Sequence, residues 1–162
     1  MKIETAIEDI LNKQIKYEFE AAYSYLGLAA ALNTTPYVGF SHWMKKQYEE
    51  ELTHAMKLYE YIQTRQGCVK LQNFDCPTYY LKTPLEAFQL AYDLEIENTR
   101  HIHEAYYLAT QKEDLPTQIL LQWFINEQVE EENNCQTFIE KLKLAQDCTC
   151  SLLALDQEAG KR

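Results

Sequence analysis

Apolar residues recur three and four positions apart along four long stretches of the chain, which is the spacing of one face of an α-helix. These stretches cover about residues 5–33, 36–66, 84–111 and 115–144, and a weaker apolar segment follows at about 151–158. In the first stretch the apolar positions are Ile7, Ile10, Leu11, Ala21, Ala22, Tyr25, Leu28, Ala29 and Leu32. The pattern therefore predicts four long helices and a short fifth one.

Turn-forming and helix-capping residues separate the predicted helices. The second helix is expected to have Thr35 as its N-cap and Pro36 as its first residue. Gly67 is expected to end that helix, because glycine commonly follows the last turn. At the start of the third helix, Thr83 at the N-cap and Glu86 three positions later make a capping box.

Residues 67–83 show no helical pattern, and a connection of this length in a compact domain needs a purpose. The simplest purpose is a crossover from one end of a bundle to the other. A helix of about 31 residues is about 46 Å long, and about 17 extended residues can span it. We therefore predict an all-α chain forming a single domain over residues 1–162, an up-down-down-up four-helix bundle with a long crossover between its second and third helices.

The charge balance narrows the classes of partner. Lys and Arg number 15 against 25 Asp and Glu, for a net charge of −10. This argues against binding to nucleic acid or to an anionic membrane, since both need a basic surface. It suits cations such as metal ions, although an acidic balance also serves plain solubility. With no apolar run of about 18 residues and no secretory signal pattern, we expect no membrane span and a cytoplasmic location.

The cysteines are read as free thiols. Their number, five, is odd, and no Cys-x-x-Cys pair occurs among them. A reducing compartment favours the same interpretation.

Ionisable residues interrupt every apolar stripe near its middle. They are Glu18 in the first helix, Glu51 and His54 in the second, Glu95 in the third, and Glu127, Gln128 and Glu131 in the fourth. Burying one unpaired carboxylate costs several kcal/mol, and no Lys or Arg occupies these stripe positions. Four such breaks at similar depth predict a bound cation, with a structural network of buried polar groups as the alternative.

The residue types indicate which metals would bind. Glu51 and His54 are three positions apart, so they share a helix face and can reach one metal. Carboxylate oxygens with one imidazole suit iron, manganese or zinc and suit copper(I) badly. A second acidic group, Glu50, Glu127 and Glu130, could bind a further cation or simply be a solvated face. Trp123 is expected to pack in the core rather than take part in chemistry.

These features resemble the ferritins, and more closely the non-haem bacterial ferritins. The resemblance covers nearly the whole chain. Its carriers are Leu11-Asn12-Lys13-Gln14, Glu18, Tyr25, residues 48–54 (Tyr-Glu-Glu-Glu-Leu-Thr-His), Glu95, and residues 121–132 (Leu-Gln-Trp-Phe-Ile-Asn-Glu-Gln-Val-Glu-Glu-Glu).

The resemblance implies a role for each of these residues. The first iron site would be Glu18, Glu51 and His54, and the second Glu51, Glu95 and Glu131, with Glu51 bridging and Gln128 beside the second iron. Glu50, Glu127 and Glu130 would form an extra iron site that shares Glu131. Tyr25 would be either a one-electron donor or a core aromatic residue. Residues 128–131 lack the second Glu-x-x-His of bacterioferritins, and Leu52 replaces their haem-binding Met, so no haem is expected.

The implied activity is oxidation of Fe(II) by dioxygen and storage of ferric oxyhydroxide mineral inside a hollow homo-oligomer of 24 subunits. The predicted fifth helix resembles that of the ferritins. Two alternatives remain: a di-iron oxidase or oxygenase acting on an organic substrate, and a non-catalytic storage subunit. The first would need an apolar pocket beside the metals, and the second would be favoured by missing ligands.

Overall fold

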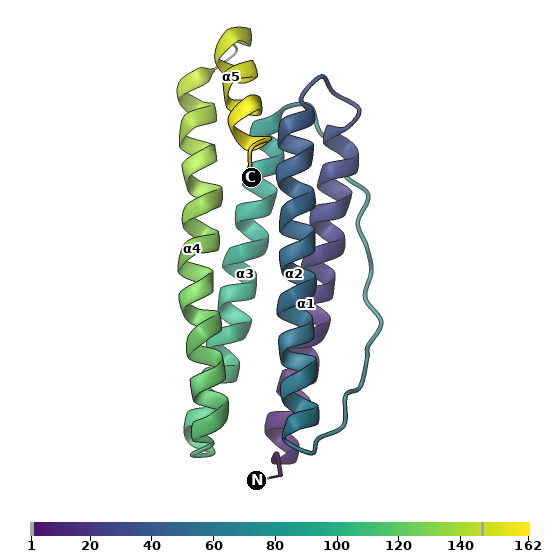
Figure 1. Ribbon diagram of the computed structural model, residues 1–162, viewed down its shortest axis with the longest axis vertical. Helices are drawn as coiled ribbons and strands as arrows, with labels where there is room; N and C mark the ends of the chain where they lie inside the picture. Colours follow the sequence, from purple (N-terminus) through teal and green to yellow (C-terminus); the bar gives the residue numbers. More distant parts are fainter. Residues whose placement is uncertain (1, 147) are drawn as a thin grey trace.

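A computed structural model describes residues 2–146 and 148–162, and in that part of the chain all regular structure is helical. The helices are α1 (Thr5–Leu32), α2 (Val38–Thr64), α3 (Pro84–Gln111), α4 (Leu115–Ala145) and α5 (Thr149–Ala159). The first four lie side by side, and the crossover runs along the outside of the bundle before α3 begins (Figure 1). The predicted up-down-down-up bundle with a short fifth helix is confirmed. No described helix is long and apolar enough to cross a membrane.

The start of α2 differs from the prediction. The helix begins at Val38 with Tyr37 at its N-cap, two residues later than expected. The hydroxyl of Thr35 instead donates to the carbonyl oxygen of Leu32 (2.6 Å) and accepts a hydrogen bond from the backbone N–H of Tyr37 (3.2 Å). Thr35 is therefore committed to the exit of α1, and it lies with Pro36 in the turn between the two helices.

The end of α2 was predicted at Gln66, but the helix ends at Thr64. The left-handed residue of this turn is Gln66, with φ of 55°, and the N–H of Gly67 then donates to the carbonyl of Ile62 (2.9 Å). Glycine is needed at position 67 for space, because a Cβ there would lie 2.8 Å from methyl carbons of both Ile3 and Ile62.

The third and fourth helices begin with side-chain caps. The Thr83–Glu86 capping box is present as predicted. Asp114 caps α4 by accepting the N–H of Thr117 (3.1 Å), and its two carboxylate oxygens each accept an N–H from Arg65 at 2.9 Å. This bidentate pair joins the end of α2 to the start of α4, and it lowers the pKa of Asp114.

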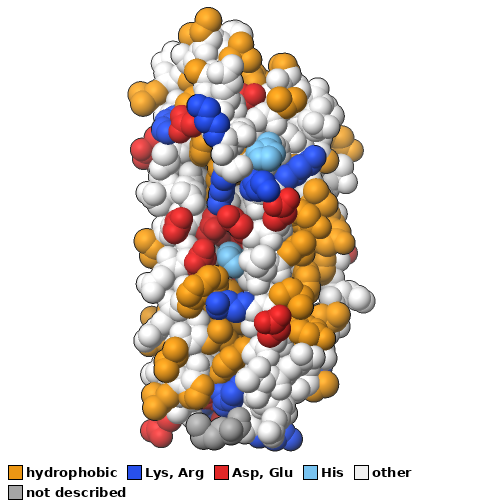
Figure 2. Space-filling view, in the orientation of Figure 1, with side chains coloured by type: hydrophobic (Ala, Val, Ile, Leu, Met, Phe, Trp, Pro, Cys, Tyr) orange, Lys and Arg blue, Asp and Glu red, His pale blue; other side chains and the backbone are white. Residues whose placement is uncertain are grey.

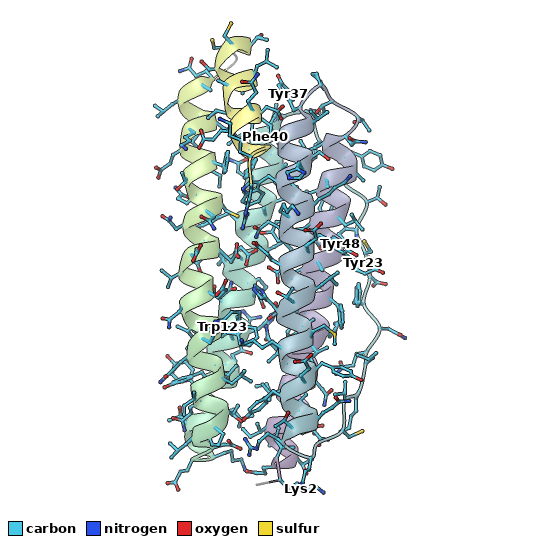
Figure 3. All side chains as sticks on the ribbon, viewed as in Figure 1. Lys2, Tyr23, Tyr37, Phe40, Tyr48 and Trp123 are labelled. Carbon is cyan, nitrogen blue, oxygen red and sulfur yellow. The ribbon has the colours of Figure 1, made fainter. Side chains whose placement is uncertain are left out.

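The apolar core is divided into two clusters along the bundle axis. The upper cluster includes Tyr25, Leu28, Phe40, Trp43, Phe88 and Phe138, and the lower cluster includes Ile7, Leu11, Leu58, Ile62, Ile102 and Phe124. Figure 3 shows side chains filling the space between the four helices. Every predicted stripe break falls between the two clusters along its own helix, so the fold gathers the interrupting residues into one layer.

The fifth helix begins at Thr149, earlier than predicted, and folds back beside the upper part of the bundle (Figure 1). Buried Asp156 accepts the backbone N–H of Phe40 in α2 at 2.8 Å. The backbones approach so closely that a Cβ on Gly39 would lie 1.8 Å from the carbonyl oxygen of Asp156. The cysteines are free thiols in the structure; Cys135 is buried and the other four are exposed.

Candidate metal centre

Six of the predicted site residues lie in the layer between the two apolar clusters. They come from all four long helices: Glu18 from α1, Glu51 and His54 from α2, Glu95 from α3, and Gln128 and Glu131 from α4. Each exposes at most 3% of its surface. The sequence prediction that these side chains are buried at one depth is therefore met by the fold.

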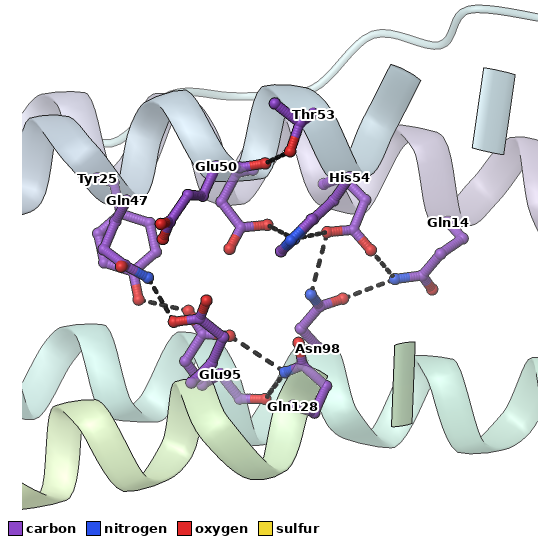
Figure 4. Close-up of polar contacts among 12 residues, drawn as sticks. Gln14, Tyr25, Gln47, Glu50, Thr53, His54, Glu95, Asn98 and Gln128 are labelled. Carbon is purple, nitrogen blue, oxygen red and sulfur yellow. Dashed lines mark hydrogen bonds and ion pairs between the residues drawn. The ribbon is translucent and has the colours of Figure 1, made fainter. Parts of the chain in front are cut away.

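One group within this layer is close enough to share a metal ion. Ligand atoms of Glu18, Glu51 and His54 all lie within 4.8 Å of one another. The Nδ1 atom of His54 is 3.3 Å from one Glu51 oxygen and 3.9 Å from one Glu18 oxygen (Figure 4). The other oxygen of Glu51, Oε1, is buried and has no hydrogen-bond partner. A buried charged oxygen without a partner is costly, so this atom needs a cation or a proton.

Two amide side chains hold Glu18 in place. Gln14 donates to one carboxylate oxygen of Glu18 (2.8 Å), and Asn98 donates to the other (3.2 Å). Gln14 also donates to the side-chain oxygen of Asn98 (2.6 Å), so the two amides brace each other. The role of Asn98 was not predicted from the sequence, although Asn98 lies three residues after Glu95 on the same helix face, which is a usable signal.

The other side of the layer contains Glu95 and Glu131. The hydroxyl of Tyr25 donates to one oxygen of Glu95, and Gln128 donates to the other at 3.1 Å. Gln128 also donates to the backbone carbonyl of Glu95 (3.2 Å). Gln47, which the sequence analysis did not single out, donates to Glu131 (2.7 Å). These donors fix the orientation of both carboxylates without neutralising them.

Burial and mutual repulsion raise the pKa values of the carboxyl groups in this layer. Burial raises the pKa of Glu95 to about 7 and that of Glu131 to about 7, and the charge of Glu95 adds to the effect on Glu131. The pKa of Glu51 is raised well above its usual range by burial first and then by the charges of Glu95 and Glu18. A divalent cation among these groups would stabilise their charged forms, because opposite charge favours ionisation.

The second predicted acidic cluster, Glu50, Glu127 and Glu130, is more exposed to solvent than the buried layer. Glu50 and Glu127 are half-buried and Glu130 is exposed. Among the residues that the structure describes, these three do not form a group with ligand atoms within 4.8 Å of one another. Glu50 instead forms an ion pair with Arg162 at 2.6 Å.

Two aromatic residues border the layer. Tyr25 is fully buried, and its ring is edge-on to Trp43 with centroids 6.4 Å apart. The expectation that Trp123 packs in the core was wrong, because 37% of its surface is exposed. Its ring lies 5.5 Å from the His54 ring, and the ammonium of Lys57 lies 3.9 Å from the Trp123 ring centroid. Trp123 therefore lines the outer side of His54.

A four-helix bundle with inward carboxylates and a Glu-x-x-His pair defines the class of ferritin-like proteins. The family model described as a ferritin-like domain matches residues 8–145. The chain belongs to the ferritin family.

Two relatives illustrate how far this similarity extends. The chain is 32% identical over 160 residues to a bacterial non-heme ferritin of Bacteroides fragilis, covering 99% of each chain. It is also 32% identical over 154 residues to one from Staphylococcus aureus, covering 95% of this chain and 93% of that protein.

Solved ferritin structures superpose closely on the chain. An open-pore ferritin from the archaeon Archaeoglobus fulgidus is 39% identical, with a TM-score of 0.97 and coverage of 99% of both chains. An engineered closed form of the Archaeoglobus ferritin has the same identity and TM-score, with coverage of 99% of this chain and 98% of that chain. The resemblance drawn from the sequence is thus confirmed at the level of family and fold.

Proposed function

We propose that this chain is an iron-storage ferritin with ferroxidase activity. It would oxidise Fe(II) with dioxygen at a di-iron centre inside each subunit and store ferric oxyhydroxide within a hollow cage, with 24 subunits as the expected number. The observation that carries the proposal is the buried group Glu18, Glu51 and His54, in which one Glu51 oxygen has no partner. The iron ions are substrate and cargo here rather than a resident cofactor.

In this proposal the donor set would hold two divalent ions. Glu18, Glu51 and His54 would hold the first Fe(II), with Nδ1 of His54 facing the two carboxylates. Glu95 and Glu131 would hold the second Fe(II), and Glu51 would bridge the pair through its two oxygens. Two Fe(II) ions supply +4 against four carboxylates, so the occupied site is close to neutral.

The same ligands favour oxidation of the iron. Carboxylate oxygens bind Fe(III) more strongly than Fe(II), since the harder and more highly charged ion prefers anionic oxygen. The two Fe(II) ions would give one electron each to one dioxygen molecule, which takes up two protons and leaves as hydrogen peroxide. Hydrolysis of the ferric product then releases protons. Carboxyl groups whose pKa lies near 7 must lose their protons when the metal arrives, so binding itself releases protons.

The amide and hydroxyl groups around the carboxylates would position them. Gln14 and Asn98 hold both oxygens of Glu18, so its orientation is set before metal binds. Gln128 and Tyr25 each donate to Glu95. In this proposal Tyr25 would pass an electron toward the second iron. Such outer partners commonly tune metal affinity as well as geometry.

Stopped-flow measurement of Fe(II) oxidation tests the proposal. Replacing His54 by Ala removes the imidazole ligand of the first iron. We expect the fast phase to fall by at least about tenfold, since even the loss of an outer partner of a metal ligand costs about 10- to 100-fold. His103→Ala is the matched control, because His103 is exposed on α3. Unchanged fast oxidation in His54→Ala, with the assembly intact, would refute the site assignment.

A further inference from the structure

Arg162 lies beyond α5 and reaches back to the side of α2. One of its guanidinium nitrogens is 2.6 Å from a carboxylate oxygen of Glu50. The guanidinium carbon lies 4.8 Å from the ring centroid of Trp43, and the Nε2 atom of His42 is 3.0 Å from the backbone carbonyl oxygen of Arg162. Three residues of α2 therefore contact Arg162: Glu50 and Trp43 at its guanidinium, and His42 at its backbone.

The docking of α5 explains why Arg162 arrives at this place. The contact of Asp156 with the Phe40 N–H and the close approach at Gly39 fix α5 against α2. The residues after α5 then lie beside the upper part of the bundle, as the C label in Figure 1 shows. The position of the guanidinium is therefore a consequence of the tertiary fold.

The ion pair of Glu50 and Arg162 lies at the surface of the molecule. Figure 2 shows acidic and basic side chains gathered side by side on this face of the molecule. The pair is partly solvated, with 26% of the Arg162 side chain and 44% of the Glu50 side chain exposed.

We propose that the guanidinium of Arg162 is a built-in counter-ion that competes with a divalent cation for Glu50. This inference rests on the proposed function, because it concerns a cation bound beside the two deeper metals. While Arg162 occupies Glu50, a third cation must displace it before using that carboxylate. Arg162 thus sets how tightly a third cation binds. Its guanidinium pairs with Glu50 and not with the carboxylates of the two deeper metals.

Zn²⁺ is a suitable probe, because it has no redox chemistry and accepts carboxylate and imidazole ligands. The intact, metal-free assembly is titrated calorimetrically with Zn²⁺, and the equivalents beyond two per chain are analysed. Exposed ion pairs are weak, so removing the competitor in Arg162→Gln is expected to tighten the third equivalent by about two- to fivefold. Adding Glu50→Gln to Arg162→Gln should return the affinity for the third Zn²⁺ to that of the wild type.

Two controls separate the position of the charge from other effects. Arg100→Gln removes the same charge from α3, where Arg100 pairs with Glu97 and Glu104, and should leave the third equivalent unchanged. Arg162→Met keeps an apolar stem of similar length against Trp43 and should tighten binding as Arg162→Gln does. If only Arg162→Gln tightens binding, the effect comes from lost packing and the proposal is wrong.

Two further results would overturn the inference. One is an unchanged third equivalent in both Arg162 variants, and the other is equal tightening in Arg100→Gln. Fe(II) oxidation is recorded on the same samples, so the two proposals can fail separately. If the protein oxidises Fe(II) normally and binds two Zn²⁺ per chain, but the Arg162 variants bind the third Zn²⁺ no more tightly, only the counter-ion proposal is refuted. If neither the first two Zn²⁺ bind nor Fe(II) is oxidised, the proposed function is refuted as well.

Discussion

Raising the pH from 5 to 8 should destabilise the metal-free protein, because buried carboxyl groups must ionise without a cation. Glu95 and Glu131 each have a pKa raised from 4.5 to about 7 in the folded chain, mainly by burial. Below pH 4.5 the group is protonated in both the folded and the unfolded chain, so it contributes no penalty. Between pH 4.5 and 7 the unfolded chain loses the proton first, and folding becomes less favourable as pH rises.

The size of this effect follows from the pKa difference. One pKa unit corresponds to about 1.4 kcal/mol, so either group alone costs about 3 kcal/mol once the pH exceeds 7. For a chain of this size, 1 kcal/mol changes the melting temperature by about 2–4 °C. The melting temperature should therefore fall by about 6–12 °C per group, and Glu51, whose pKa is also raised, adds in the same direction.

Thermal unfolding of chelator-treated protein, followed by circular dichroism at several pH values from 5 to 8, measures this directly. The control variant Glu95→Gln/Glu131→Gln removes two of the titrating groups and should show a flatter profile. Saturating Zn²⁺ should abolish the decline between pH 5 and 7, since a ligand that binds only the folded state stabilises it. A melting temperature that is constant or rises over this range in the metal-free wild type, in parallel with the control variant, would refute the reasoning.

Three further changes test other parts of the structure. Asp114→Ala removes both the α4 cap and the carboxylate that pairs with Arg65. It should lower the free energy of unfolding by about 2–3 kcal/mol, measured by denaturant titration against Asp114→Asn, which keeps a capping oxygen. Gly39→Ala places a Cβ against the backbone of Asp156 and should detach α5, which limited proteolysis would detect as new cleavage there. Glu130→Ala should preserve the fast first phase of Fe(II) oxidation and change the iron-to-oxygen ratio or later turnover, measured with an oxygen electrode; loss of the first phase would show that the two clusters were divided wrongly.

The bundle and the depth of its centre could be predicted because both depend on local periodicity. Each helix carries its own apolar stripe, and the break in each stripe falls between two core clusters. Once antiparallel packing aligns the helices, Glu18, Glu51, Glu95 and Glu131 lie in one buried layer. The Thr83 capping box was equally local, since its two hydrogen bonds involve residues three positions apart.

Features that depend on distant contacts were not predictable in the same way. Thr35 is a good N-cap residue, but the exit of α1 uses its hydroxyl first. Gln47 and Asn98 look like ordinary polar residues until the fold places them against Glu131 and Glu18. The ion pair of Arg162 with Glu50 joins residues 112 positions apart, and no periodic pattern marks it.

Aerobic loading with excess Fe(II), followed by size-exclusion chromatography with iron detection, tests the central claim most directly. We expect a uniform, very large assembly that carries far more ferric iron than the two ions per chain of the buried centre. The same experiment on His54→Ala should show much slower loading into an assembly of the same size. A small particle that retains about two irons per chain would contradict storage and would favour an oxidase acting on an organic substrate.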